Sequence, residues 1–64
     1  MTHDEIIAQI EDERAYMEKC RAAHDRAWAR WQELRLSEDD EAMTNNWRRV
    51  ERCRRRIEEL EAML

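Results

Sequence analysis

Two stripes of apolar side chains run along this chain at helical spacing, and they are out of phase with each other. In both stripes the inward residues recur at alternating intervals of three and four, the heptad pattern of packed helices. If the first stripe continued in phase past residue 35, it would turn Glu38, Glu41 and Arg48 inward, where burial of unpaired groups is costly. The sequence therefore predicts two helices with a break between them. The inward positions are His3, Ile6, Ile10, Glu13, Met17, Cys20, His24, Ala27, Trp31 and Leu34 in the first stripe, and Met43, Asn46, Val50, Cys53, Ile57, Leu60 and Leu64 in the second.

The break and the start of each helix carry local signals. Ser37 is a good N-cap, and the four acids at 38–41 favour the positive end of a helix dipole. Thr2, followed three residues later by Glu5, forms a capping box that starts the first helix near residue 3. We predict one domain over 1–64, with a helix at about 3–35, a turn at about 36–37 and a second helix at about 38–63.

The predicted fold class is all-α, a two-helix antiparallel hairpin of the coiled-coil type. Reversal at the turn aligns Met17 with Ile57 and brings the two stripes together along their length. Residues 3–9 overhang, which leaves Ile6 and Ile7 without a partner inside the chain. A core this small rarely supplies more than about 3–5 kcal/mol without other support. We therefore expect two hairpins to pair into a homodimeric four-helix bundle.

Three tryptophans, Trp28, Trp31 and Trp47, fall near the predicted turn. Each can bury about 150–250 Å², which is more than two slender helices can cover. Two interpretations are open: the indoles complete the core of a dimer, or they anchor a different protein, since tryptophan is enriched at binding hot spots. The candidate residues for partner binding or the dimer core are Ile6, Ile7, Trp28, Trp31 and Trp47.

Arginine dominates the middle of the second helix, where Glu51 is the only acid among residues 48–56. Such a positive footprint suits nucleic-acid phosphates, and its candidate residues are Arg48, Arg49, Arg52, Arg55 and Arg56. The overall formal charge of -4 favours the alternative of a solvated face, in which the arginines pair with acids such as Glu11, Glu13 and Glu18.

Cys20, His24 and Cys53 converge once the hairpin folds, because the first two lie four residues apart on one face. Zinc would need a fourth ligand, and the usual Cys-x-x-Cys pairs are missing. A disulfide between the cysteines is unusual in a reducing compartment. We expect two small core thiols and a histidine hydrogen-bonded at the edge of the core, with no metal and no cofactor.

No catalytic constellation is recognisable, since the chain has no glycine-rich phosphate loop and its single serine is assigned to a cap. We therefore predict a small non-catalytic protein for protein–protein interaction and regulation, such as a phage or mobile-element inhibitor of a host complex. A homodimer and a heterologous protein are the expected partners.

Two alternatives remain. One is a nucleic-acid-binding regulator that uses the arginine face, because chain length and helix order are similar to those of the Rop-like hairpin regulators of RNA. The other is a metal or redox site at the cysteines. No stretch approaches the ~20 apolar residues of a membrane span, so we expect no membrane partner and a cytoplasmic location, in the producing cell or in an infected host.

Overall fold

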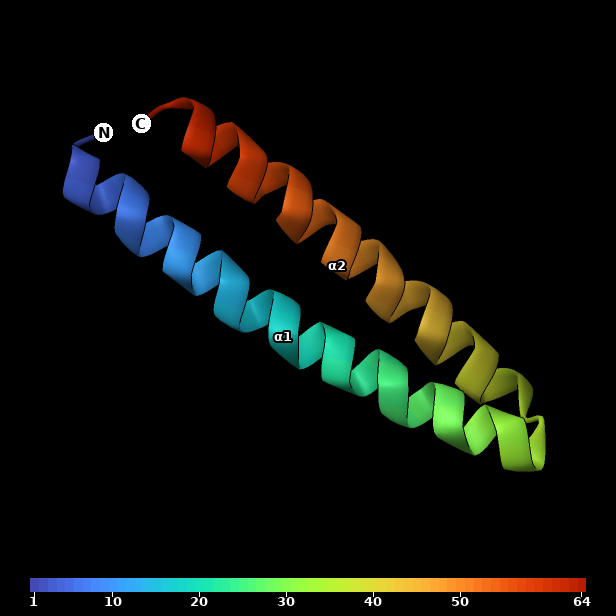
Figure 1. Ribbon diagram of the computed structural model, residues 1–64. Coiled ribbons are helices and arrows are strands. Elements are labelled where there is room, and N and C mark those ends of the chain that lie inside the picture. The colour runs from blue at the N-terminus through green and yellow to red at the C-terminus, as the bar shows by residue number, and fades with distance from the viewer.

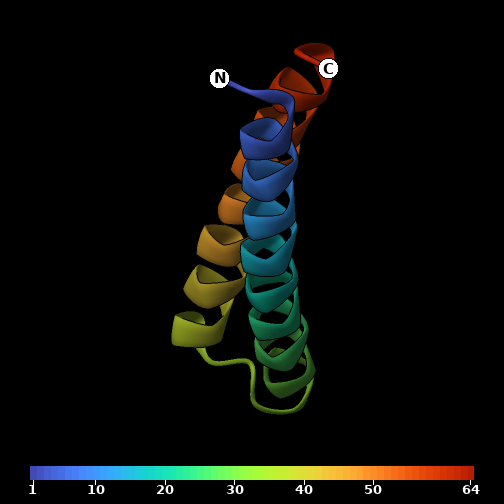
Figure 2. The ribbon, with the colours of Figure 1, turned by 90° about the vertical axis from the view of Figure 1, so that its left-hand side faces the viewer.

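The protein forms two long helices joined by a sharp turn. The computed structural model describes residues 1–64, and its helices are α1 (His3–Leu34) and α2 (Ser37–Ala62). The two helices pack against each other and run in opposite directions, so that both termini lie at one end (Figure 1). The hairpin measures 48 × 14 × 12 Å between Cα atoms. Viewed from the side, the helix axes cross at a small angle instead of running strictly parallel (Figure 2). The predicted all-helical hairpin is confirmed.

The start of α1 shows one half of the predicted capping box, the N-cap contact of Thr2, whereas no hydrogen bond joins the Glu5 carboxylate to the Thr2 N–H. The hydroxyl oxygen of Thr2 accepts a hydrogen bond from the backbone N–H of Glu5 over 3.2 Å. Asp4 and Glu5 add negative charge to the first turn, where the helix dipole is positive. This N-cap fixes the first helical residue at His3.

The turn consists of Arg35 and Leu36, one residue earlier than predicted. Arg35 adopts the left-handed conformation, with φ 55° and ψ 35°, and its N–H donates to the carbonyl of Trp31. Glycine usually takes this position, because a Cβ atom makes it unfavourable. The Arg35 guanidinium lies 4.2 Å from the centre of the Trp31 ring, and this cation–π contact offsets part of that cost.

The prediction that Ser37 caps α2 is wrong. Leu36 occupies the N-cap position, no side chain caps the helix there, and Ser37 is the first helical residue. Backbone N–H groups of Asp39 and Asp40 are satisfied by the Leu36 carbonyl instead. Leu36 has the extended backbone of an N-cap residue, and the left-handed Arg35 just before it reverses the chain direction. The reversal therefore needs no capping hydroxyl.

The core follows the two predicted stripes. At the end that holds the termini, Ile6, Ile10, Ile57 and Leu60 form one buried cluster, with Met17 packed against it. Towards the turn the seam contains smaller buried side chains, namely Cys20, Ala27, Val50 and Cys53. Leu60 has no exposed surface at all, which makes it the most completely buried apolar side chain of the fold.

The expectation that Ile6 lies in an unpartnered overhang is also wrong. Its side chain is 4% exposed and packs in the cluster with Ile57 and Leu60. Because the reversal occurs one residue early, α2 reaches further along α1, and Leu64 lines a hollow beside Ile7. Ile6 is therefore part of the hairpin core, whereas Ile7 remains 37% exposed.

One charged side chain lies on the seam near the turn. Asp39 is seven residues before Asn46, an inward position, and it is 5% exposed. Its Oδ2 atom makes no hydrogen bond and lies 3.8 Å from Nε of Arg30 on α1. Asp39 also belongs to the first turn of α2, where the helix dipole favours an acid. The ion pair and the dipole together explain a carboxylate at this buried position.

Candidate functional site

The hairpin has two long sides, one on each flank of the buried seam. On one side Arg14 of α1 pairs with Glu61 of α2, with Nη2 and Oε1 3.1 Å apart. On the other side Arg56 of α2 donates to the side chain of Gln9 of α1 over 3.3 Å. Residues seven, fourteen or twenty-one positions apart lie on the same helix face. The side of any exposed residue therefore follows from its spacing to one of these two pairs.

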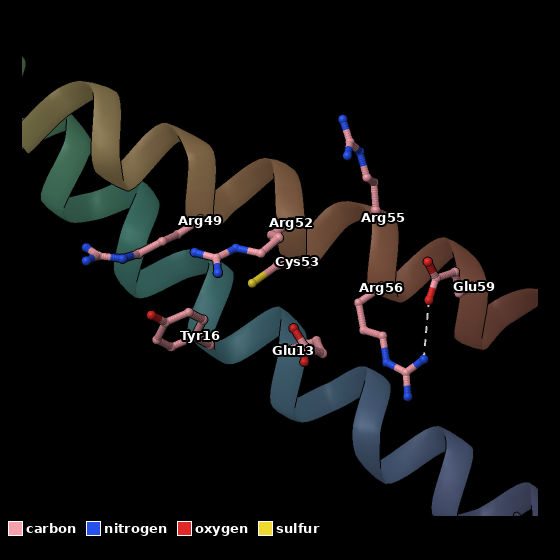
Figure 3. Close-up of a pocket in the computed structure, with 8 residues that line it drawn as sticks. All are labelled: Glu13, Tyr16, Arg49, Arg52, Cys53, Arg55, Arg56 and Glu59. Atoms are coloured by element: carbon pink, nitrogen blue, oxygen red, sulfur yellow. Dashed lines mark hydrogen bonds and ion pairs between the residues drawn. The ribbon is translucent and has the colours of Figure 1, made fainter.

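The side of Gln9 and Arg56 contains a groove of about 520 Å³ between the helices, which we call the arginine groove. Four of its eight lining residues are arginines of α2 (Figure 3). Its lining is Glu13, Tyr16, Arg49, Arg52, Cys53, Arg55, Arg56 and Glu59. In Figure 3 the side chains of Arg49 and Arg52 extend towards α1, whereas Arg55 points away from it. The four arginines are among the candidates predicted from the sequence, whereas Tyr16, which is 50% exposed at this groove, is not.

Three of the four arginines of this groove have no acidic partner. Arg56 pairs with Glu59 at 3.3 Å, but Arg49 only donates to the Asn46 amide oxygen, and Arg52 and Arg55 make no ion pair or hydrogen bond. The expected pairing of these arginines with Glu11, Glu13 or Glu18 is not found in this chain. Positive charge in the groove is therefore left available to a ligand.

Further cations of α1 extend the same side towards the turn. Lys19 and Arg26 follow Tyr16 by three and ten residues, a spacing that keeps them on one helix face. Neither forms an ion pair, whereas Arg30, on the same face, pairs with Glu38 and Asp39 of α2. With Arg49 and Arg52 opposite, the middle of this side is cationic on both helices. The α1 cations are not predictable from the arginine run of α2, because they are single residues on the other helix.

The opposite side, which we call the tryptophan face, carries exposed apolar side chains. Its members are Ile7, Trp28 and Trp47, because they stand whole heptads from Arg14 or Glu61. Their exposed fractions are 37%, 47% and 44%. The Trp47 ring packs on His24, with ring centres 5.3 Å apart, and the His24 ring lies 3.1 Å from the Asp25 carboxylate.

The three tryptophans do not form one cluster. Trp31 is half-buried on the seam under Arg35, while Trp28 and Trp47 stand on the tryptophan face, and no aromatic contact joins the indoles. The prediction that two helices cannot cover all three is confirmed for Trp28 and Trp47. Trp31 belongs mainly to the hairpin itself.

The tryptophan face carries more acids than arginines, and each of its arginines is paired. Arg14 pairs with Glu61, and Arg21, one heptad on, pairs with Glu18 at 3.8 Å. On α2, Arg54 pairs with Glu51 of the same helix at 3.3 Å. Every arginine of this face therefore has an acidic partner, in contrast to the arginine groove.

The cysteines lie buried between the two sides. Both Cys20 and Cys53 are free thiols, 5% and 4% exposed. No group of three or more His, Cys, Asp or Glu side chains is placed to hold a metal ion. His24 faces Trp47 and Asp25, so the three suggested ligands do not form one site.

Burial raises the pKa of the Cys53 thiol from 9.0 to about 11. The hydrogen bond between this thiol and Glu13, together with the negative charge of that carboxylate, raises the pKa further, while Arg52 lowers it. A thiol is a poor nucleophile until it ionises, so Cys53 is expected to be inert near neutral pH.

This shift predicts a loss of stability at high pH. Because the folded state holds the Cys53 proton more tightly than the unfolded chain does, the thiol's contribution is complete below about pH 9. It disappears as the pH rises towards 11, at a cost of about 3 kcal/mol at most. Urea unfolding of the unmodified protein and of Cys53→Ala between pH 8 and 11 measures this loss of unfolding free energy. The variant should lose less stability over this range, and parallel curves would show that Cys53 is not the titrating group.

Comparison with protein-family models, with curated proteins and with solved structures finds no match to this chain. Neither helix contains an apolar stretch long enough to cross a bilayer. The two sides of the hairpin, one with unpaired arginines and one with exposed tryptophans, are the features from which its function is inferred.

Proposed function

We propose that this protein is a small non-catalytic interaction and regulatory protein that assembles through its tryptophan face into a homodimeric four-helix bundle. The observation that carries the proposal is the position of Trp28 and Trp47. Both indoles are nearly half exposed, stand on the same side, and share it with Ile7. Tryptophan is strongly enriched among the residues that dominate binding energy at protein interfaces.

Charge favours a second copy of the chain as the occupant of this face. A two-fold dimer brings the same surface of each copy together, so the surface must tolerate its own charges. The tryptophan face brings no unpaired arginines together, because Arg14, Arg21 and Arg54 are each paired with an acid. The opposite side would place unpaired arginines against unpaired arginines. Dimerisation through the tryptophan face therefore leaves both arginine grooves at the outer surface of the bundle.

The size of the face also suits a dimer. It extends along a hairpin 48 Å long and 14 Å wide. Such a surface is comparable to the roughly 800 Å² that each partner buries in a specific complex. Association would add stability to a domain of 64 residues, whose own core contains only eight buried apolar residues.

Removal of both exposed indoles tests the proposal. The double variant with Trp28→Ala and Trp47→Ala is expected to raise the dimer dissociation constant about 1,000-fold or more, since each hot-spot residue contributes about 2 kcal/mol or more. Light scattering during size-exclusion chromatography over a dilution series measures the change. Tyr16→Ala is the matched control, because Tyr16 is equally exposed on the opposite side.

The control should dimerise like the unmodified protein, and circular dichroism should show the same helix content in all three. Equal dissociation constants for the double variant and the control would contradict the proposed interface. An unmodified protein that stays monomeric with Trp28 and Trp47 exposed would also overturn it, in favour of a heterologous protein as the occupant of this face.

A further inference from the structure

We propose that the arginine groove binds single-stranded nucleic acid, with phosphates on the free cations and a base stacked on Tyr16. This inference goes beyond the proposed dimer and does not depend on it. The cations assigned to phosphates are Lys19 and Arg26 of α1 and Arg49 and Arg52 of α2.

Availability of charge is the first step. Protein cations bind nucleic acid by replacing the counterions of the phosphates, which requires cations that are not already neutralised. Arg49 and Arg52 line the groove without an acidic partner, and Lys19 and Arg26 likewise form no ion pair. The arginines of the tryptophan face are all paired, so free positive charge is concentrated on one side.

The acids of this side do not cancel that charge. Of the two that line the groove, Glu59 pairs with Arg56 and Glu13 makes no ion pair, so the lining contains four arginines against two acids. Asp12 and Glu33, one heptad before Lys19 and one heptad after Arg26, lie at the two ends of this side and not in its middle. The net charge of -4 for the whole chain thus conceals a cationic middle on this side, which explains why composition alone disfavours a phosphate ligand.

The aromatic ring selects the form of the ligand. Tyr16 is 50% exposed and lies opposite Arg52 across the groove (Figure 3). Proteins that bind single strands without strong sequence preference combine a cationic groove with aromatic rings on which bases stack. A duplex keeps its bases stacked inside and offers no ring to Tyr16. The groove, at about 520 Å³, lies in the usual range of small-ligand sites, about 300–1,000 Å³, and has room for one nucleotide.

Fluorescence anisotropy with labelled oligouridylate and oligothymidylate of roughly 12 nucleotides tests the proposal. For single strands the logarithm of the affinity falls with the logarithm of salt by about 0.7 per phosphate contact. The double variant with Arg49→Gln and Arg52→Gln is expected to lose two contacts and to reduce this slope by about 1.4. Tyr16→Ala should weaken binding about fivefold or more with an unchanged slope, and Tyr16→Phe should retain the affinity.

The matched control removes the same charge from outside the groove. Neither Arg48 nor Arg54 of α2 lines the groove, and Arg54 pairs with Glu51 on the opposite side of the hairpin. Together, Arg48→Gln and Arg54→Gln should change the slope by less than half as much as the groove variant. Circular dichroism confirms that each variant keeps its helices.

Three results would overturn the proposal. The first is an equal loss of salt dependence in the groove variant and the control, which would indicate unspecific attraction. The second is equal affinity for duplex and single-stranded probes. The third is equal affinity for a polyglutamate peptide with no effect of Tyr16→Ala, which would assign the groove to an acidic protein segment.

Discussion

Leu60→Ala is expected to lower the free energy of unfolding by about 2–5 kcal/mol, enough to remove most of the stability of a hairpin this small. Leu60 has no exposed surface and packs in the cluster with Ile6, Ile10 and Ile57. Truncation of its side chain leaves a cavity between the two helices, and no further layer of the hairpin can move in to fill it. Urea unfolding followed by circular dichroism at one fixed protein concentration measures the loss.

Leu64→Ala is the matched control, because Leu64 is the next residue of the same stripe and is 55% exposed. Its effect on the free energy of unfolding should stay within about 0.5 kcal/mol. Similar effects of the two substitutions would contradict the observed packing at the end that holds the termini. A large effect of Leu64→Ala alone would indicate that α2 is displaced by one turn along α1.

The heptad pattern predicted the fold because inward position and burial coincide along most of both helices. Ile10, Cys20, Val50 and Cys53 are all buried as their positions require. The phase change between the stripes demanded a reversal, and no other element competes with the two helices. Alternation of three and four residues is a strong signal when it persists over several heptads.

The turn was predicted one residue too late because its conformation depends on Arg35, a residue type with no preference for turns. Arg35 takes the left-handed conformation that glycine normally provides, and its contact with Trp31 is tertiary. The capping potential of Ser37 therefore pointed to the wrong residue. A displacement of one residue at the reversal was sufficient to bring Ile6 into the core.

The candidate site was predictable only in part. The run of arginines was visible in the sequence, but pairing separates them: Arg54 and Arg56 have acidic partners on α2, while Arg49 and Arg52 do not. Such pairing depends on side-chain positions that spacing alone does not give. Tyr16 and the α1 cations flank the buried stripe on the same side as Arg49 and Arg52. This relation is visible only when the heptad positions of the two helices are compared.

Association through the tryptophan face predicts that two chains occupy one particle in solution. Each chain has a mass of 7.9 kDa, and the proposed bundle has twice that mass. Because association stabilises the folded state by mass action, the population of dimer should fall, and the hairpin should become easier to unfold, as the protein is diluted.

Sedimentation equilibrium of the unmodified protein over a wide concentration range tests this central claim most directly. We predict a mass of twice 7.9 kDa at the higher concentrations, with dissociation towards the single-chain mass on dilution. A mass of 7.9 kDa at every concentration, from a protein whose helices are intact, would contradict the account.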